Sequence, residues 1–334
     1  MNDIDFVLLW VDGNDPEWLK EKSKYSPSRI DDSNSSNRFK DLGLLKYWFR
    51  AVEVYTPWVR KIHFVTWGHL PSFLNTSHPK LHIVNHKEYI PAKWLPTFSS
   101  HTLELNIHRI NGLSDFFVYF NDDTFLNKPL PNTYFFRDGL PCANYSEIPL
   151  AFKDLPEVWI CAAANGLGVI NENFNKWTQI KKSPGKYFNA RYALKDNFRS
   201  LLMEIIQPSM YTGFRSFHCP AAFTKKTFEE VWNKQSSILE LTSSHKFRDK
   251  SDVNQWLLQW WQIASGAFNP QRLKTCTFQL VPEITKDICK AILSHSYDMI
   301  CLSDSNDNNA TDQALYEVVK AFESALPQKS SFER

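Results

Sequence analysis

The segment FFVYFNDD, residues 116–123, joins a strongly apolar run to an abrupt acidic end. Consecutive apolar and aromatic residues of this length are typical of a strand that is buried on both faces of a sheet. The run stops at Asn121-Asp122-Asp123, residue types that favour a turn. The segment therefore predicts a central strand that is followed at once by an acidic loop.

Shorter strands and helices alternate around this segment in the first part of the chain. Apolar runs predict strands at 6–10, 62–66 and 81–84. Helical spacing predicts one helix through residues 44–52 and another that begins at its N-cap Ser100 and ends before Gly112. This alternation predicts an α/β fold with a mainly parallel sheet and crossover helices.

The expected domain organisation has three parts. Residues 1–140 form the α/β core, and residues 216–334 form a helical region that completes the active site and the fold. Between them, residues 141–215 are interrupted by prolines and carry a basic stretch from Lys181 to Lys195, which predicts an insertion or lid. Three helices are expected in the last part, at 223–232, 253–263 and 311–326.

The composition excludes several classes of protein. The 334 residues include 38 basic and 36 acidic side chains, so no overall field attracts the chain to nucleic acid or to an acidic membrane. No stretch approaches the roughly 20 apolar residues of a membrane span, and the N-terminus has no signal-like pattern. The six cysteines contain no Cys-x-x-Cys pair, which fits a reducing compartment. We therefore expect a globular, cytoplasmic protein.

Asp122 and Asp123 are the candidate metal ligands. Ligands of open α/β sheets bind beyond the carboxyl ends of the strands, and Asp12 follows the strand at 6–10 in the same way. The two acidic loops are therefore expected to share one crevice. Adjacent carboxylates suit Mg²⁺ or Mn²⁺, which would bridge them to phosphate oxygens. The alternative is a hydrogen-bonded turn without a ligand.

The helix that begins at Ser100 carries polar side chains on one face. His101, Glu104 and His108 share this face, for which we favour anion or sugar contacts, or exposure to solvent, over a zinc site. Arg109 follows directly and can present a bidentate fork to phosphate.

Two later segments offer further candidates. His218 stands in an apolar stretch and is either a general base for a sugar hydroxyl or a hydrogen-bonded structural histidine. The run 245–252 supplies cations for phosphate and a carboxylate for metal or orientation. It could equally be a solvated charge run that caps the next helix through Ser251.

Four blocks of the chain together resemble the Stealth family, which includes bacterial capsular polysaccharide phosphotransferases and the lysosomal-enzyme GlcNAc-1-phosphotransferase. The blocks span nearly the whole chain. They are IDFVLLWVDGNDP at 4–16; a long block from RFKD at 38–41 to YFNDD at 119–123; FHCP at 217–220; and FRDKSD at 247–252 with the later CLSD at 301–304 and PQKSSFE at 327–333. The chain departs from the family pattern at 41–45, where DLGLL replaces the usual Asp-Asn-Gly-Glu-Leu, and at Ser303, where Asn is usual.

The resemblance implies a Rossmann-like, GT-A-like nucleotide-diphosphate-sugar transferase fold with a bound divalent metal. It implies a hexose-1-phosphate transferase that moves sugar-1-phosphate from a UDP-sugar to a carbohydrate hydroxyl and releases UMP. The setting would be capsule or exopolysaccharide synthesis, with a growing polysaccharide or lipid-linked glycan as the acceptor. Peripheral association with a membrane assembly complex at the inner face of the membrane would fit such an acceptor.

The resemblance also implies binding roles for individual residues. Asp12, Asp15, Arg38 and Asp41 are expected at the nucleotide-sugar. The metal ligands are then Asp122 and Asp123.

The implied catalytic residues are His218, Arg109 and Arg248. His218 would deprotonate the acceptor hydroxyl, and the two arginines would stabilise charge on the transferring phosphoryl group. Two other functions stay open on the sequence alone. One is a metal-dependent glycosyltransferase that releases UDP, and the other is a carbohydrate-binding assembly protein without catalytic activity.

Overall fold

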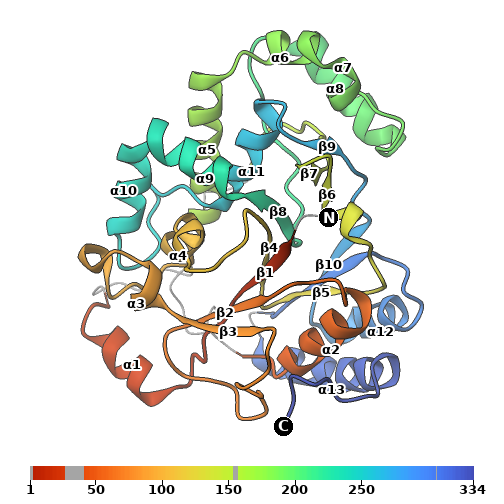
Figure 1. Cartoon of the computed structure of the whole chain (residues 1–334). Helices are drawn as coiled ribbons and strands as arrows, with labels where there is room; N and C mark the ends of the chain where they lie inside the picture. The colour runs from red at the N-terminus through yellow and green to blue at the C-terminus, as the bar shows by residue number, and fades with distance from the viewer. Residues whose placement is uncertain (1–2, 27–40, 153–156, 306) are drawn as a thin grey trace.

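A sheet of five strands forms the centre of the fold and confirms the predicted α/β class. Its strand order is β3-β2-β1-β4-β8, in which β8 alone is antiparallel to its neighbour (Figure 1). The strands are β1 (Ile4–Leu9), β2 (Ile62–Thr66), β3 (Leu81–Asn85), β4 (Phe116–Asn121) and β8 (Ala221–Thr224). All four strands predicted in the first 140 residues are present, with ends that differ by no more than two residues.

The computed structural model of the chain describes residues 3–26, 41–152, 157–305 and 307–334. Arg38, predicted to bind the nucleotide-sugar, lies outside the described residues. The longer helices are α1 (Pro16–Ser23), α2 (Leu45–Tyr55), α4 (Ser100–Leu105), α5 (Val158–Asn173), α6 (Lys176–Lys182), α8 (Leu194–Ile206), α9 (Lys225–Lys234), α10 (Ser236–Ser244), α11 (Gln255–Ala264), α12 (Thr285–Leu293) and α13 (Asn308–Ala325); α3 (His86–Tyr89) and α7 (Pro184–Tyr187) are single turns. Among the described helices, none is both long and apolar enough to cross a membrane.

Alternate side chains of the central strands build two cores. Phe6 and Leu8 of β1 belong to the core that contains buried residues of α2, α12 and α13. Val7 and Leu9 belong to the opposite core, with α9 and α11. Helices cover both faces of the sheet (Figure 1). Burial on both faces is the reason why these strands are almost continuously apolar.

Two small sheets extend this framework. In the first, β5 (Thr124–Leu126) pairs antiparallel with β11 (Met299–Ser303), which pairs in parallel with β10 (Thr275–Gln279). The second contains β6 (Phe136–Arg137), β7 (Leu140–Ala143) and β9 (Asn269–Pro270). The pairing of β5 with β11 brings the last third of the chain beside the end of β4.

The predicted boundaries of several helices need correction, most clearly those of α9 and α4. The segment 223–232 begins inside β8, and α9 starts only at Lys225, where the Thr224 side chain accepts a hydrogen bond from the Thr227 amide at 3.3 Å. The helix expected from Ser100 to Gly112 ends at Leu105 and continues as a 3₁₀ turn at Ile107–Arg109. Its N-cap position is occupied by Ser99, without a side-chain hydrogen bond.

The polar face of α4 is buried, contrary to the solvated face that the sequence allowed. His101 and Glu104 are 4% and 7% exposed, because α10 and α11 pack over this helix. His101 Nδ1 lies 2.9 Å from a carboxylate oxygen of Asp252, which is itself buried. The run 245–252 is therefore not simply solvated, and the cap of α11 is Asn254 instead of the predicted Ser251.

The segment 141–215, predicted as an insertion or lid, folds into β7 and the helices α5 to α8. An antiparallel bridge between Glu147 and Phe214 joins its two ends. Helix α5 packs against α11 of the core. The predicted role of the segment as a lid stays a prediction.

Asp5 is a buried charge at the beginning of β1. Its carboxylate accepts hydrogen bonds from Arg60 Nε at 2.8 Å and from the Ser114 amide at 2.8 Å, and it lies 2.9 Å from His63 Nε2. Burial alone would raise the pKa of Asp5, but the hydrogen bonds from His63, Arg60 and Ser114 lower it below its ordinary value of 3.8. The network ties β1 to β2 and to the start of β4.

We expect Asp5→Asn to destabilise the protein by about 1.5–3 kcal/mol, the range for hydrogen bonds to a charged group. The partner Arg60 is 36% exposed and can turn to water, which limits the cost. Because the pKa of Asp5 is lowered by folding, its stabilisation is present above pH 3.8 and is lost as the pH falls through the folded-state pKa. Urea unfolding of both proteins at pH 7 and below pH 4 measures the difference.

Asp115→Asn is the matched control, because Asp115 is exposed and precedes the neighbouring strand. Equal stability of the Asp5→Asn variant and this control at pH 7 would contradict the assigned role of the Asp5 network.

Candidate active site

The candidate site lies at the carboxyl ends of β1 and β4. From β1 the chain adds β2 and then β3 on one side, and it then returns to add β4 on the other side of β1. The direction in which strands are added therefore reverses between β1 and β4. Leu9 pairs with Asn121, and the residues that follow both strands therefore emerge at the same edge. Ligands of open α/β sheets bind at such a switch point.

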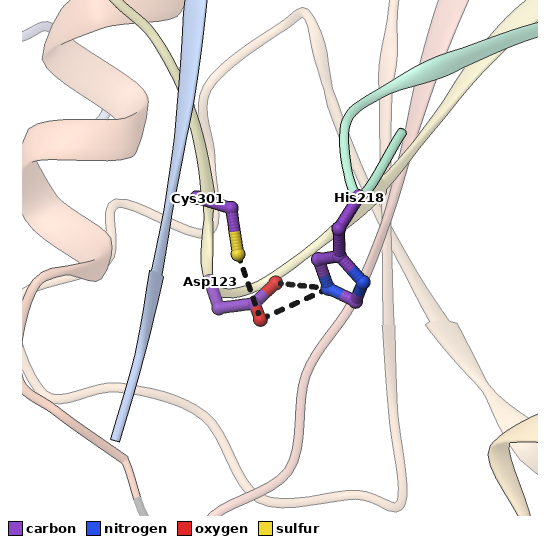
Figure 2. Close-up of side chains that lie close together, drawn as sticks. All are labelled: Asp123, His218 and Cys301. Atoms are coloured by element: carbon purple, nitrogen blue, oxygen red, sulfur yellow. Dashed lines mark hydrogen bonds and ion pairs between the residues drawn. The ribbon is translucent and has the colours of Figure 1, made fainter. Parts of the chain in front are cut away.

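The residues after β4 form a tight turn. The Thr124 hydroxyl donates to the Asn121 carbonyl at 2.8 Å, and the Leu302 amide of β11 donates to the Asp123 carbonyl at 2.9 Å. The backbone at Asn121-Asp122-Asp123 is therefore a hydrogen-bonded turn, which was the alternative to a metal site in the sequence analysis. The side chain of Asp123 points from this turn toward Cys301 and His218 (Figure 2).

His218 is brought to this turn by β8. Because β8 runs antiparallel to β4, with Ala221 opposite Tyr119, the loop before β8 returns to the end of β4. His218 Nε2 lies 3.1 Å and 3.3 Å from the two carboxylate oxygens of Asp123 (Figure 2). The His218 side chain is 43% exposed, so a ligand can reach it.

The environment of His218 has opposing effects on its charge. Desolvation by the surrounding protein lowers its pKa, whereas the hydrogen bond and negative charge of Asp123 raise it, and the net effect is a pKa above the ordinary value. Asn121 adds a weaker contact, since its Nδ2 lies 3.4 Å from His218 Nε2. His218 is therefore oriented by polar partners while it stays accessible.

A series of hydrogen bonds between polar side chains holds Asn121 in position beside His218. The Tyr119 hydroxyl donates to Asn121 Oδ1 and also lies 3.3 Å from Glu104 Oε1. Burial and the nearby Glu104 keep the pKa of Tyr119 well above its ordinary value, so its hydroxyl stays a proton donor. The sequence prediction did not include Tyr119. Its position two residues before Asn121, on the same face of β4, was the only local signal.

Four carboxylates concentrate negative charge at this edge. Burial and the charge of Asp12 raise the pKa of Asp41 above its ordinary value. Reduced solvation, with the charges of Asp123 and Asp41, raises the pKa of Asp122. Asp122 nevertheless keeps exposed surface, so a solute cation can approach it. The strand pairing and these mutual effects place the Asp12 and Asp122-Asp123 loops near one another, and a crevice shared by them stays a prediction.

Three donor atoms of the site lie close enough together to hold a metal ion. Asp123, His218 and Cys301 place an oxygen, a nitrogen and a sulfur atom within 4.8 Å of one another. The Cys301 thiol lies 3.4 Å from Asp123 Oδ2, and burial and the charge of Asp123 keep its pKa well above the ordinary value. The thiol is therefore the hydrogen-bond donor in this contact. Carboxylate oxygens suit a hard cation, whereas an imidazole nitrogen and a thiol suit a softer ion such as Zn²⁺, so Mg²⁺ or Mn²⁺ at Asp122 and Asp123 stays a prediction.

The predicted nucleotide-binding residues lie around this edge. The Asp12 amide donates to His69 Nε2 at 2.8 Å, which holds the loop after β1. Asp15 caps α1 by accepting from the Trp18 amide at 2.8 Å. Asp41 accepts from the Gly43 amide at 2.9 Å. These contacts shape the loops, and binding of a nucleotide by the same residues stays a prediction.

The two predicted catalytic arginines occupy different places. Arg248 donates to the Ser100 hydroxyl at 2.8 Å, at the start of α4, which follows the carboxyl end of β3. Arg109 lies at the other end of that helical segment, with its guanidinium 4.8 Å from the Trp232 ring. Gly112, three residues later, accepts a hydrogen bond from Arg60 near the start of β1. Arg109 thus lies toward the opposite edge of the sheet from Asp123, whereas Arg248 lies toward the same edge.

Fold and site together define an α/β protein with an acidic, histidine-containing site at the switch point of a parallel sheet. Two regions of the chain match the Stealth protein family: residues 2–29 match its conserved region 1, and residues 38–142 match its conserved region 2. The matched regions contain Asp12, Asp122 and Asp123, whereas His218 lies outside them.

Full-length relatives establish the family. The chain is 37% identical to capsular polysaccharide phosphotransferase WcwK of Streptococcus pneumoniae, with 100% of this chain and 99% of the relative covered. It is 38% identical to exopolysaccharide phosphotransferase cps2G of Lactiplantibacillus plantarum, with 99% and 96% covered. It is also 38% identical to receptor polysaccharide phosphotransferase WefC of Streptococcus oralis, with 100% of both covered. The chain belongs to the Stealth family of phosphotransferases, as the resemblance predicted.

The solved structures offer a weaker comparison. The galactosyltransferase LgtC is similar over 98% of both chains, but with 11% identity and a TM-score of 0.39. A likeness of this level carries no argument about the site.

We expect Mn²⁺ to bind this site and Asp123→Asn to weaken the binding at least about tenfold, because the variant loses a carboxylate in the cluster of negative charge. Electron paramagnetic resonance of free Mn²⁺ during titration of the protein measures the affinity.

Cys301→Ser is the matched variant and should bind Mn²⁺ about as well as the original protein, because the hydroxyl can still donate to Asp123. Loss of metal binding in Cys301→Ser but not in Asp123→Asn would contradict an oxygen-based site.

Proposed function

We propose that this protein is a hexose-1-phosphate transferase that acts in the synthesis of a capsular or related surface polysaccharide. One observation carries the proposal: His218 and Asp123 meet at the switch point of the sheet, in a chain whose full-length relatives are named polysaccharide phosphotransferases. An exposed histidine beside a carboxylate cluster suits transfer of a phosphoryl group to a hydroxyl.

In the proposed reaction an acceptor hydroxyl attacks the phosphorus atom that carries the hexose of a UDP-sugar. A bond forms between the acceptor oxygen and this phosphorus, and the bond between the same phosphorus and the oxygen of UMP breaks. The products are a phosphodiester-linked sugar and UMP. His218 takes the proton of the hydroxyl, while the contact of its Nε2 with the Asp123 carboxylate holds the imidazole in place.

Asp122 and Asp123 are the proposed ligands of Mg²⁺ or Mn²⁺. When bound, such an ion neutralises diphosphate oxygens and stabilises the leaving nucleotide. Asp12, Asp15, Asp41 and Arg38 are the proposed nucleotide-sugar contacts.

Arg248 and Arg109 are the proposed partners of the phosphoryl charge. The position of Arg248 near the start of α4 supports this role, because α4 begins at the carboxyl edge of the sheet. Arg109 lies toward the opposite edge of the sheet, so the proposed role requires Arg109 to move toward the site when the substrate binds.

The acceptor is proposed to be a growing polysaccharide or lipid-linked glycan, met at the cytoplasmic face of the membrane. Peripheral association with a membrane assembly complex would bring the enzyme to such an acceptor.

We expect the purified full-length chain to release UMP from a UDP-hexose in the presence of Mn²⁺ and a polysaccharide acceptor. Attack at phosphorus leaves UMP, whereas attack at the anomeric carbon would leave UDP. A panel of UDP-hexoses with chromatographic identification of the nucleotide separates the two reactions. Release of UDP in place of UMP would identify a glycosyltransferase, and binding of polysaccharide without turnover would identify a binding protein.

We expect His218→Asn to lower kcat by about 10²–10⁴, the usual contribution of a general acid or base. The KM for the UDP-sugar should change little, because His218 is proposed to act on the acceptor. Steady-state kinetics at saturating metal measure both constants. His78→Asn is the control, because His78 contacts Ser331 near the C-terminus, away from this edge of the sheet. The proposal is wrong if His218→Asn, or Asp123→Ala, keeps full turnover.

A further inference from the structure

Helix α8 has its apolar side on the outside of the molecule. The residues Leu194, Phe198, Leu201 and Ile205 follow one another at helical spacing along one face. They are 89%, 61%, 50% and 74% exposed. Surface helices of soluble proteins normally turn such a stripe toward the core. Helix α8 lies at the periphery, beside α6 and α7 (Figure 1).

The inner side of α8 is polar instead. Asp196, Ser200 and Glu204 are buried at a spacing of four residues. The Asp196 carboxylate accepts from Arg215 at 2.8 Å, and the Ser200 hydroxyl accepts from the Glu147 amide at 3.1 Å. Because these bonds hold α8 to the body of the protein, the helix cannot bury its apolar face by rotation without breaking them.

Glu204 adds an ion pair to the same attachment. Its carboxylate lies 3.2 Å from Lys176 Nζ, which also contacts Glu147 at 3.1 Å, and Lys176 and Glu147 are fully buried. Breaking a buried ion pair is costly, since it leaves an uncompensated charge. The outward orientation of the apolar face is thus built into the packing of α8.

The exposed charges of residues 174–210 are all basic. Asp196 and Glu204 are the acidic residues of this segment, and both are buried in ion pairs, as is the basic Lys176. Four of the basic residues are exposed: Lys181, Lys182, Arg191 and Lys195. The chain as a whole carries a formal charge of only +2, so this basic surface is local.

An exposed apolar stripe flanked by lysine and arginine matches the chemistry of an anionic lipid surface. Apolar side chains enter the boundary between headgroups and acyl chains, and basic side chains contact lipid phosphates. A second copy of the chain is a poorer match, because the same basic residues would then face one another. We propose that α8 lies in the plane of an anionic membrane surface and docks the protein there.

This proposal does not depend on the proposed transferase reaction. Binding to lipid requires neither a nucleotide-sugar nor a metal, so its failure and failure of the reaction are separate results.

The test is sedimentation of the purified full-length chain with sucrose-loaded vesicles. One set contains phosphatidylcholine alone, and the other contains about 30% phosphatidylglycerol to supply anionic charge. We expect binding to the anionic vesicles and little to the neutral ones, with a decrease at high salt.

Two variants separate the apolar and electrostatic contributions. Phe198→Gln combined with Ile205→Gln should weaken binding to anionic vesicles at least about tenfold, because apolar burial is lost. Arg191→Glu combined with Lys195→Glu should weaken it by more than about tenfold, since each basic residue near the surface contributes about fivefold. All four side chains are exposed, so the thermal unfolding temperature should be unchanged.

The matched control is Val54→Gln combined with Leu241→Gln, which replaces exposed apolar residues of α2 and α10. It should bind vesicles like the original protein. Absence of binding, or equal binding by the α8 variants and this control, would overturn the proposal. A change from dimer to monomer in the Phe198→Gln, Ile205→Gln variant, measured by light scattering without lipid, would also overturn it and assign the face to a second copy.

Discussion

The pairing of β4 with β1 on one side and with β8 on the other is the constraint on which the site depends. Parallel pairing with β1 brings the ends of both strands to one edge, and antiparallel pairing with β8 returns the preceding loop to that edge. His218 and Asp123, separated by 95 positions in the chain, lie 3.1 Å apart only because both pairings hold. A shift of one residue in register would move the side chains of β4 to opposite faces of the sheet.

The framework also explains how a polar site is held next to an apolar core. The Asp122-Asp123 turn is tied to β11 through backbone, and Asn121 is tied to α4 through Tyr119. On the other side of the sheet, Leu44 is 2% exposed and belongs to the core with α2. The resemblance to the Stealth family led us to expect Glu at this position, and a carboxylate there would be costly to bury in this structure. The departure from the pattern is thus part of the packing of this chain.

The chain is nearly neutral as a whole, but it has a negatively charged region and a positively charged region. Carboxylates gather after β1 and β4, where they raise the pKa of Asp122, and basic side chains gather around α8. The two surfaces have different proposed ligands: a cation with its diphosphate at the sheet edge, and anionic headgroups at the helix. The net charge does not reveal such patches, because it adds up acidic and basic residues that lie far apart in space.

The sequence by itself determined the features that depend on neighbouring residues. Apolar runs predicted the strands β1 to β4, and the change from Phe120 to Asn121 predicted the end of β4. The four sequence blocks predicted the family. Only the tertiary structure decided which distant residues meet. It buried Glu104 under α10 and α11, separated Arg109 from Asp123, and brought Cys301 and Tyr119 to the site. It also turned the polar side of α8 inward. These outcomes rest on long-range packing and ion pairs, whose partners cannot be read from the local sequence.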